Sequence, residues 1–153
     1  MSLCIGYDIG SISVNRAVLD KNEKIISVLP YTRHIGEPLK LVIQDMKVLF
    51  GKYGGNISGI VFTGSGAKGL ADNLKIDFIN EIEAIVTAFK KISPDAVSVI
   101  EIGGQDSKFI DLDSGDYAMN ELCAAGTGSF LDQQASRFGL TIEEFAELAL
   151  RSK

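Results

Sequence analysis

The chain is 153 residues long, is 46% hydrophobic and carries a formal net charge of −5 at pH 7. This composition predicts a folded protein, and the acidic balance, with no basic run longer than Lys90-Lys91, argues against a nucleic-acid partner. No apolar run approaches the roughly 20 residues that span a bilayer, and the N-terminus does not resemble a secretion signal, so we expect no membrane partner. Cys4 and Cys123 do not form the disulfide framework of a secreted protein, which favours a cytoplasmic location.

The first half of the chain predicts three strands, a helix and a further strand. Apolar alternation and short turns predict the strands Leu3 to Ile9, Ser13 to Asp20 and Lys24 to Leu29. Apolar residues at helical spacing predict a helix from Pro38 to Gly51. The β-branched run Ile57 to Thr63 predicts a buried strand in a parallel pairing.

The second half repeats the three-strand pattern and adds helices. The predicted elements are a helix from Glu81 to Ile92, three strands within Ala96 to Asn120, a helix from Ser129 to Phe138 closed by Gly139, and a last helix that begins at a Thr141 and Glu144 capping box. Pro94 breaks the chain, so we predict a first lobe at 1–94 and the beginning of a second lobe at 95–153. Because the second lobe would leave a sheet face and an edge uncovered, we expect the chain to be a fragment.

Two short segments share one order of features and form an internal repeat. One reads Tyr7-Asp8-Ile9-Gly10-Ser11 and the other reads Ile100-Glu101-Ile102-Gly103-Gly104. Glycine in a hairpin turn lets backbone N–H groups approach a phosphate, and the carboxylate before it can order Mg²⁺ through water or polarise an attacking water. One such hairpin is weak evidence because many hairpins carry glycine. The duplication predicts two turns that clamp the phosphates of a nucleotide from both sides.

The residues predicted to act on this nucleotide fall into two groups. The catalytic group contains the carboxylates and the polar turn residues that could orient water or metal, namely Asp8, Glu101, Gln105 and Asp106. The cofactor-binding group contains the small turn residues, one lysine and a later glycine-rich segment, namely Gly10, Ser11, Ser13, Gly103, Gly104, Lys108, Gly126, Thr127 and Gly128. Lys108 is either a counter-charge for phosphate or, taken alone, an outward-facing strand lysine.

A rival motif lies between the two hairpins. Gly64-Ser65-Gly66-Ala67-Lys68-Gly69 matches the dinucleotide-binding fingerprint and follows a predicted strand. The acidic residue expected about 20 positions later falls inside a predicted helix rather than at a strand end. Gly69 follows Lys68 where a Walker A loop needs Ser or Thr. The simplest interpretation is a strand-to-helix turn.

Cys123 precedes the small residues Ala124-Ala125-Gly126-Thr127-Gly128. A thiolate at a helix N-terminus is stabilised by unpaired N–H groups and the helix dipole, which lowers the pKa of the thiol and helps it to ligate metal. One cysteine cannot hold a cluster, so the residues alone leave a structural and a functional role equally open. Cys4 is expected to be a buried, small apolar residue, and His34, without neighbouring ligand types, a surface histidine.

Two stretches of the second half carry a specific resemblance: Val99 to Lys108, which reads VIEIGGQDSK, and Asn120 to Asp132, which reads NELCAAGTGSFLD. Together with the Asp8 hairpin and Thr63-Gly64-Ser65-Gly66, they resemble the ATP-dependent activators of 2-hydroxyacyl-CoA dehydratases and the related ATPase subunits of benzoyl-CoA reductase (the BadF/BadG/BcrA/BcrD type). The resemblance covers nearly the whole chain.

The resemblance implies an α/β fold of the actin-like ATPase class, in which two ribonuclease-H-like lobes with mixed sheets surround an ATP site. It implies ATP and Mg²⁺ as ligands, and a homodimer that shares one 4Fe-4S cluster with Cys123 as the first ligand from each subunit. ATP hydrolysis would drive electron transfer from a donor such as ferredoxin or flavodoxin to the partner dehydratase or reductase. The second cluster ligand and the adenosine segment would lie beyond Lys153, so the isolated chain would be inactive.

Three positions depart from the family pattern. Ile12 stands where the pattern Asp-x-Gly-Ser-Thr has Thr, Asn15 stands where a lysine follows, and Glu101 replaces the more usual Asp. Ile12 and Asn15 weaken the first phosphate contact, whereas Glu101 keeps the charge but would shift any metal-bound water. Ile12 and Asn15 keep an alternative open, a non-redox actin-like sugar or acyl kinase or a nucleotide-binding module that has lost its catalysis.

Overall fold

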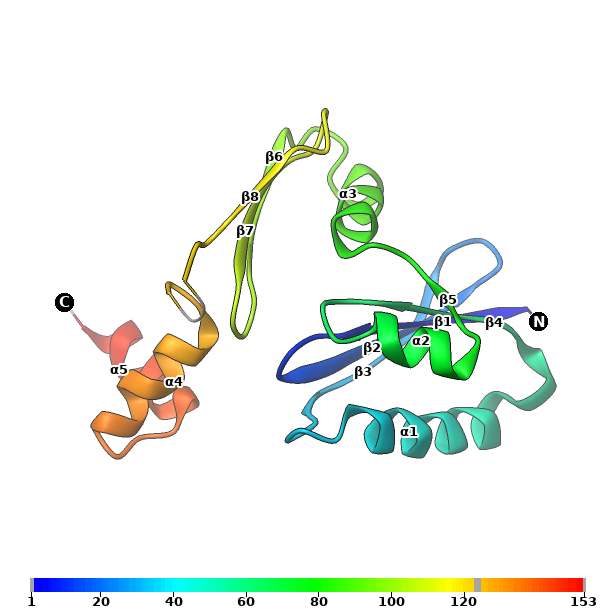
Figure 1. Cartoon of the computed structure of the whole chain (residues 1–153), viewed down its shortest axis with the longest axis horizontal. Coiled ribbons are helices and arrows are strands. Elements are labelled where there is room, and N and C mark those ends of the chain that lie inside the picture. The colour runs from blue at the N-terminus through cyan, green and yellow to red at the C-terminus, as the bar shows by residue number, and fades with distance from the viewer. Residues whose placement is uncertain (1, 123–124, 153) are drawn as a thin grey trace. The chain divides into compact units, whose positions relative to one another are not determined.

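The computed structural model describes residues 2–122 and 125–152. The chain forms two compact units, Met1–Ala88 and Phe89–Lys153, and each unit is described by itself. Figure 1 shows the elements in chain order.

Unit 1 is built on a five-stranded mixed sheet with the strand order β3-β2-β1-β4-β5. The strands are β1 (Leu3–Ile9), β2 (Ser13–Asp20), β3 (Ile25–Arg33), β4 (Ile57–Thr63) and β5 (Asp77–Phe78). β1 pairs antiparallel with β2 and parallel with β4, so the predicted hairpin and the predicted parallel strand are both confirmed. Short turns make sequential strands antiparallel, whereas β1 and β4 are joined through a helix.

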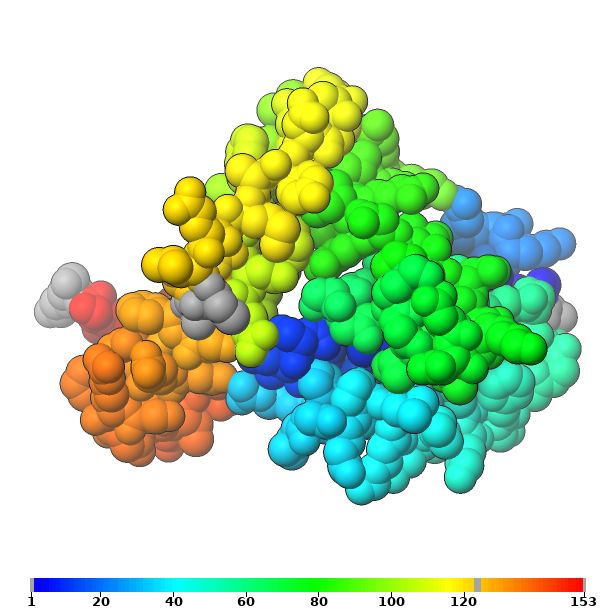
Figure 2. Space-filling view, viewed as in Figure 1, coloured from blue at the N-terminus to red at the C-terminus, as the bar shows by residue number. Residues whose placement is uncertain are grey.

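Three α-helices begin in this part of the chain. They are α1 (Pro38–Tyr53), α2 (Lys68–Leu74) and α3 (Glu81–Ile92), and a 3-10 turn, η1 (Gly54–Asn56), follows α1. Pro38 stands at the start of α1, where its missing N–H costs no helical hydrogen bond. The helix predicted from Glu81 to Ile92 is confirmed. Figure 2 shows the side chains of α1 (cyan) on the outer surface of unit 1.

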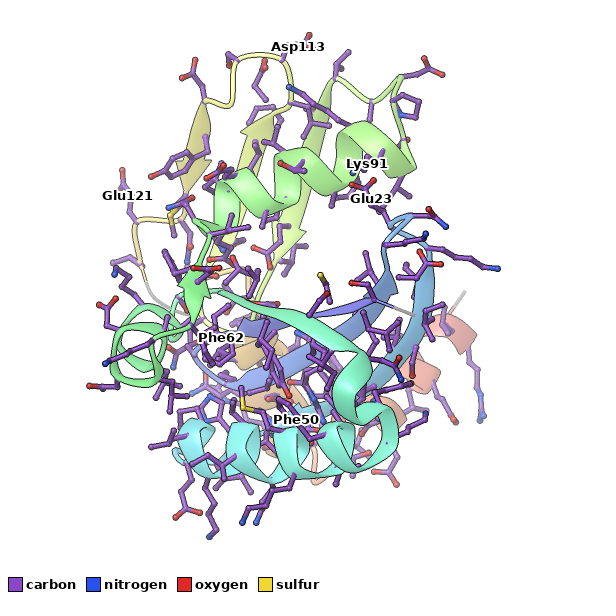
Figure 3. All side chains as sticks on the ribbon, turned by 90° about the vertical axis from the view of Figure 1, so that its right-hand side faces the viewer. Glu23, Phe50, Phe62, Lys91, Asp113 and Glu121 are labelled. Carbon is purple, nitrogen blue, oxygen red and sulfur yellow. The ribbon has the colours of Figure 1, made fainter. Side chains whose placement is uncertain are left out.

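The core of unit 1 lies between the sheet and α1. Alternate residues of β1 are buried, because successive side chains of a strand point to opposite faces: Leu3, Ile5, Tyr7 and Ile9. Val42 and Leu49 of α1 belong to the same buried cluster, as does Phe62 of β4. Figure 3 shows Phe62 within this packed region of unit 1.

Two expectations for unit 1 are wrong. β3 does not end at Leu29 but continues through Pro30 to Arg33, which is possible because β3 is an edge strand and an edge tolerates the missing N–H of proline. Cys4 is exposed rather than buried. The strand alternation that buries Leu3 and Ile5 places Cys4 on the opposite face.

Unit 2 contains a three-stranded antiparallel sheet with the order β6-β7-β8 and two helices. Its elements are β6 (Ser98–Ile102), β7 (Ser107–Asp111), β8 (Tyr117–Met119), α4 (Gly128–Arg137) and α5 (Ile142–Arg151). Asp113 lies at the tip of the β7–β8 hairpin (Figure 3). The three strands and both helices fall where the sequence predicts them.

Local signals define the ends of the helices in unit 2. Thr141 Oγ1 accepts the N–H of Glu144 at 3.2 Å and the Glu144 carboxylate accepts the N–H of Thr141 at 2.8 Å, which confirms the capping box. Gly139, just after α4, has φ = 69°, a left-handed conformation that favours glycine after a helix.

Candidate functional site

The turn between β1 and β2 holds the first predicted phosphate hairpin. The N–H of Gly10 donates to the carbonyl of Ser13 at 2.9 Å and closes the turn. Asp8 and Asn15 are directly opposed in the strand register, and Asn15 Nδ2 donates to Asp8 Oδ2 at 3.2 Å. Asp8 is half-buried, whereas Ser11 is exposed at the tip. The carboxylate is therefore held at a fixed place beside a turn that is open to a ligand.

The turn between β4 and α2 packs against this hairpin. Gly64 has φ = 100°, and a Cβ on it would lie 2.5 Å from Asp8 Oδ1 and 2.6 Å from the carbonyl oxygen of Ile9. The N–H of Gly66 donates to that same Ile9 carbonyl at 2.8 Å. Only glycine allows this approach, since any side chain at position 64 would displace the Asp8 carboxylate.

Thr63, at the end of β4, completes this side of the site. It is the parallel neighbour of Asp8 in the register. Its Oγ1 atom is buried and has no hydrogen-bond partner among the described residues. A buried hydroxyl without a partner costs free energy, and such a group beside a carboxylate fits a bound water or another polar ligand.

Sequence reasoning missed the segment from Thr63 to Gly66 as part of this site. It interprets Gly64-Ser65-Gly66 as a strand-to-helix turn or a dinucleotide fingerprint. The turn interpretation is confirmed, because β4 ends at Thr63 and α2 begins at Lys68. The available signal was the pair of glycines spaced by one residue, which indicates close approach of another backbone. The glycine pair does not show which backbone approaches, because that is decided by the pairing of β1 with β4.

His34 was also missed, since the sequence predicts a surface histidine. Its Nε2 lies 3.2 Å from the carbonyl oxygen of Gly10, and its Nδ1 accepts the N–H of Gly36 at 3.1 Å. Because Nδ1 is an acceptor, the proton of the neutral ring sits on Nε2, which donates to Gly10. The backbone N–H of His34 donates to the carbonyl of Ile12 at 3.1 Å. His34 thus ties the loop after β3 to the phosphate hairpin.

The turn between β6 and β7 is the second predicted hairpin. Its closing hydrogen bond runs from the N–H of Gly103 to the carbonyl of Asp106 at 2.8 Å. Glu101 and Lys108 are opposed in the register. Lys108 Nζ lies 2.8 Å from Glu101 Oε2 and 3.0 Å from Asp106 Oδ1. Gln105 is exposed at the tip.

The interpretation of Lys108 as an outward-facing lysine is wrong. Its side chain is only 3% exposed, while the carboxylates of Glu101 and Asp106 are each 30% exposed. β7 directs Lys108 to the same face as the buried Ile110, so the ammonium lies under the two carboxylates. Two carboxylates around one ammonium leave one net negative charge at this turn.

The two hairpins share one local construction. In each, a carboxylate faces a polar side chain across the ladder at the same sequence separation of seven residues. In each, the first turn glycine donates its N–H to the carbonyl of the residue three positions later. They differ in the partner of the carboxylate, which is the neutral amide of Asn15 in one and the cation of Lys108 in the other. The repeat predicted from sequence is thus also a repeat of geometry.

The start of α4 packs on the second hairpin. The N–H groups of Gly128 and Ser129 donate to the carbonyls of Gly103 and Gly104 at 2.9 and 2.8 Å. A Cβ on Gly128 would lie 3.3 Å from the carbonyl oxygen of Gly103, so a small residue is needed there. These two N–H groups bind the hairpin rather than remaining open to an anion. The structure places Gly128 beside Gly103 and Gly104, and the cofactor-binding role of Gly126, Thr127 and Gly128 stays a prediction.

Thr127, the residue before α4, has a hydroxyl without a partner. Its side chain is fully buried, and Oγ1 has no hydrogen-bond partner among the described residues. Both hairpins thus have a buried hydroxyl nearby, Thr63 in unit 1 and Thr127 in unit 2.

Metal-binding groups are sparse in the described ranges 2–122 and 125–152. No three His, Cys, Asp or Glu side chains lie together there as a ligand set. Mg²⁺ does not require one, since it keeps several waters and usually takes one or two carboxylates besides phosphate oxygens. Asp8 with the Thr63 hydroxyl fits such a hydrated ion. Cys123, the predicted metal ligand, lies outside the described residues.

A further finding concerns membranes. In the described part of the chain, no helix is both long and apolar enough to cross a bilayer.

Comparison with known proteins gives a consistent family relationship. The model of the BadF/BadG/BcrA/BcrD ATPase family matches residues 5–153. The 2-hydroxyisocaproyl-CoA dehydratase activator of Clostridioides difficile is 31% identical over 97% of this chain and 57% of the relative. The activator of lactoyl-CoA dehydratase from Anaerotignum propionicum is 33% identical over 94% of this chain and 57% of the relative. The chain therefore spans little more than half the length of these curated relatives.

Solved structures show the same relationship in three dimensions. Component A of the (R)-2-hydroxyglutaryl-CoA dehydratase of Acidaminococcus fermentans superposes with a TM-score of 0.83 at 26% identity, over 100% of this chain and 60% of that one. The activator of the 2-hydroxyisocaproyl-CoA dehydratase from Clostridium difficile, solved with bound ADPNP, superposes with a TM-score of 0.81 at 29% identity, over 99% of this chain and 57% of that one. The predicted fold class, an α/β actin-like ATPase fold with a mixed sheet, is confirmed.

Proposed function

Because the chain belongs to the BadF/BadG/BcrA/BcrD ATPase family, we propose that the protein it represents is an ATP-hydrolysing activator that injects electrons into a 2-hydroxyacyl-CoA dehydratase or a benzoyl-CoA reductase type enzyme. The observation that carries the proposal is the repeated carboxylate hairpin, found twice in a chain whose named relatives are dehydratase activators. The relatives extend well beyond the matched segment, so the proposal concerns the whole protein.

ATP with Mg²⁺ would supply the phosphoryl group and its counter-charge. In unit 1 we assign Asp8 to ordering the water shell of the ion, and Gly10, Ser11 and Ser13 to the phosphates. The support is the fixed Asp8 carboxylate beside the Thr63 hydroxyl and the open tip at Ser11. Backbone N–H groups in such turns bind phosphate because their dipoles converge on one point.

In unit 2 the corresponding roles fall to the second hairpin. We assign Gly103 and Gly104 to phosphate binding and Gln105 and Asp106, with Glu101, to orienting water. The remaining cofactor-binding assignments there are Gly126, Thr127 and Gly128. Gly128 would act by holding the start of α4 against the hairpin, since its N–H donates to the carbonyl of Gly103, and the support for Thr127 is that its hydroxyl has no partner among the described residues.

The geometry changes the role proposed for Lys108 more than that of any other predicted residue. A lysine held by two carboxylates has little freedom to move to a phosphate. We therefore propose that Lys108 does not contact the phosphates directly. It acts by setting the positions of Glu101 and Asp106. This role is consistent with its burial.

The cluster and the partners complete the proposal. A 4Fe-4S cluster would supply the low-potential electron, and Cys123 would be one of its ligands in each subunit of a homodimer. Ferredoxin or flavodoxin would be the reduced donor. The support is the family membership and the position of Cys123 just before the segment that leads into α4.

The competing proposal is a non-redox actin-like kinase or a module without catalysis. Ile12 and Asn15 favour it, because neither supplies the hydroxyl or the cation that the family pattern places in the first hairpin. The Asn15 amide does bind Asp8, so the carboxylate remains oriented without that cation.

Nucleotide binding and hydrolysis by the full-length protein test the proposal. We expect Mg²⁺-dependent binding of ATP, and we expect Asp8→Asn to lower the ATPase rate at least tenfold while the fold is retained. The control is Asp113→Asn, which changes an exposed carboxylate at the β7–β8 turn. Phosphorylation of a sugar or an acyl acid by the wild type, without activation of a dehydratase, would favour the competing proposal.

A further inference from the structure

Two carbonyl groups of the first hairpin turn are held by one residue from another part of the chain. The turn runs from Gly10 to Ser13, between β1 and β2. His34, which follows β3, donates its ring Nε2–H to the carbonyl of Gly10 at 3.2 Å and its backbone N–H to the carbonyl of Ile12 at 3.1 Å. The closing hydrogen bond of the turn uses another group, the N–H of Gly10, which donates to the carbonyl of Ser13. His34 therefore fixes two peptide units in addition to the one that closes the turn.

A fixed carbonyl also fixes the N–H group at the other end of its peptide unit. A peptide unit is planar and trans, so its C=O and N–H point in opposite directions. The carbonyl of Gly10 shares its unit with the N–H of Ser11, and the carbonyl of Ile12 shares its unit with the N–H of Ser13. Because both carbonyls point to His34, these two N–H groups point away from it. Backbone N–H groups directed to one side of a turn form a concavity that binds anions.

A tight turn after β3 orients the His34 ring. The N–H of Glu37 donates to the carbonyl of His34 at 2.8 Å, and the two central residues, Ile35 and Gly36, have φ = 50° and φ = 79°. This turn brings the N–H of Gly36 to the ring Nδ1 at 3.1 Å. A ring nitrogen that accepts a hydrogen bond carries no proton, so the neutral ring has its proton on Nε2 and donates it to Gly10.

The backbone of this turn is strained at Ile35. A positive φ is rare for a β-branched residue, and the Ile35 side chain is 91% exposed, so its burial does not offset the strain. Strained backbone persists where surrounding contacts hold it, and it is common at functional sites. The hydrogen bonds of this turn lead through the His34 ring to the phosphate hairpin.

Two side chains at the hairpin offer neither a hydroxyl nor a charge to an anion. Ile12 is apolar, and the neutral amide of Asn15 donates to Asp8 Oδ2 at 3.2 Å. Phosphate binding at this hairpin therefore relies on Ser11 and Ser13 and on the direction of their N–H groups.

We propose that His34 is a positioning residue of the phosphate site: by holding the carbonyls of Gly10 and Ile12, it directs the N–H groups of Ser11 and Ser13 to the phosphates of the bound nucleotide. The inference rests on the proposed function, which assigns Ser11 and Ser13 to the phosphates but gives His34 no role. The ring acts through the turn and is not a phosphate ligand.

Two substitutions in the full-length protein separate the two hydrogen bonds of the ring. A glutamine amide nitrogen can take the place of Nε2, so His34→Gln keeps a donor for Gly10 and loses the acceptor for Gly36. An asparagine amide reaches only as far as Nδ1, so His34→Asn keeps an acceptor for Gly36 and loses the donor for Gly10. Both variants retain the backbone N–H that donates to Ile12. They are matched in chemistry and differ in the hydrogen bond that remains.

Titration calorimetry with Mg²⁺ and ADPNP, a non-hydrolysable analogue of ATP, measures the effect. We expect His34→Asn to weaken binding about fivefold to tenfold, the size of one lost neutral hydrogen bond, and His34→Gln to stay within about twofold of the wild type. Urea unfolding of both variants should show similar losses of stability, because each loses one hydrogen bond of the ring.

The same titrations distinguish failure of this inference from failure of the proposed function. Equal losses of affinity in the two variants, or an affinity of His34→Asn equal to that of the wild type, overturn the inference and leave the proposed function standing. Losses of affinity that follow the losses of stability also overturn it, because His34 would then only support the fold. A wild-type protein that binds no ADPNP rejects the proposed function and the inference together.

Discussion

Single residues at the two hairpins differ sharply in how much substitution they can tolerate. Gly64 is the most constrained, because it has a left-handed φ and a Cβ on it would meet the Asp8 carboxylate. Gly69, five residues later in α2, has no such neighbour and no positive φ. Gly64 and Gly69 can therefore serve as the test position and the control position for one substitution within the same short segment.

We predict that Gly64→Ala destabilises the protein by about 2 kcal/mol and weakens nucleotide binding, because the new Cβ both strains the backbone and displaces Asp8. Gly69→Ala should be neutral or stabilising by up to about 1 kcal/mol, since alanine is the better helix former. Urea denaturation measures the first effect and a nucleotide titration the second. Equal stability of the two variants would contradict the close contact with Asp8.

Lys108 shows how a residue can be essential through its neighbours. Lys108→Met should cost about 1–3 kcal/mol, because it leaves Glu101 and Asp106 facing each other without a cation, while their partial exposure lets water reduce the penalty. Urea denaturation of the variant and the wild type measures this loss. A loss below about 0.5 kcal/mol would mean that the two carboxylates do not need the charge of Lys108.

Among the elements, α1 is attached to the sheet by a buried ion pair as well as by apolar contacts. Arg16 Nε of β2 lies 2.6 Å from Asp45 Oδ2 of α1, as an ion contact whose N–H is not aligned for a hydrogen bond. The same guanidinium donates to the carbonyls of Val14 and Pro30 at 2.8 and 3.0 Å. Burial, together with the Asp45 charge, raises the pKa of the adjacent Tyr7 hydroxyl above its usual range, so that it stays neutral.

A double-mutant cycle separates the ion pair from its desolvation cost. Arg16→Met should cost about 3 kcal/mol, because the Asp45 carboxylate is only 15% exposed and would lose its counter-charge. Arg16→Met with Asp45→Leu should recover at least half of this loss, since no charge remains buried. Chemical denaturation of Arg16→Met, Asp45→Leu and the double variant, each against the wild type, gives the coupling free energy. Additive losses in the double variant would show that the two side chains act independently.

How far sequence predicts an element depends on whether its signal is local. The β1–β2 hairpin and the capping box of α5 were predictable, since turn glycines and Thr141 with Glu144 lie within a few residues of each other. The burial of Lys108 and the contact of His34 with Gly10 were not, because each depends on strand register or on a loop from elsewhere in the chain. β5, only two residues long, carries no pattern of its own and exists through pairing with β4.

At the scale of the whole molecule, the proposed function requires that nucleotide binding and cluster binding be separable. The nucleotide contacts are assigned to the two hairpins, whereas the cluster is assigned to Cys123. Cys4 offers a control in the same chain, because it is exposed on β1 and has no proposed role.

In the full-length protein we predict that Cys123→Ser abolishes the 4Fe-4S absorption and EPR signals after anaerobic reconstitution but leaves ATP affinity within about twofold of the wild type. The reason is that a serine hydroxyl is a poor cluster ligand, while the hairpins do not depend on the thiol. Cys4→Ser should keep the cluster, and the 153-residue chain alone, which contains only these two cysteines, should form no stable one. A cluster that survives Cys123→Ser would reject the ligand assignment, whereas loss of ATP binding in the same variant would show that the hairpins and the cysteine segment form one site.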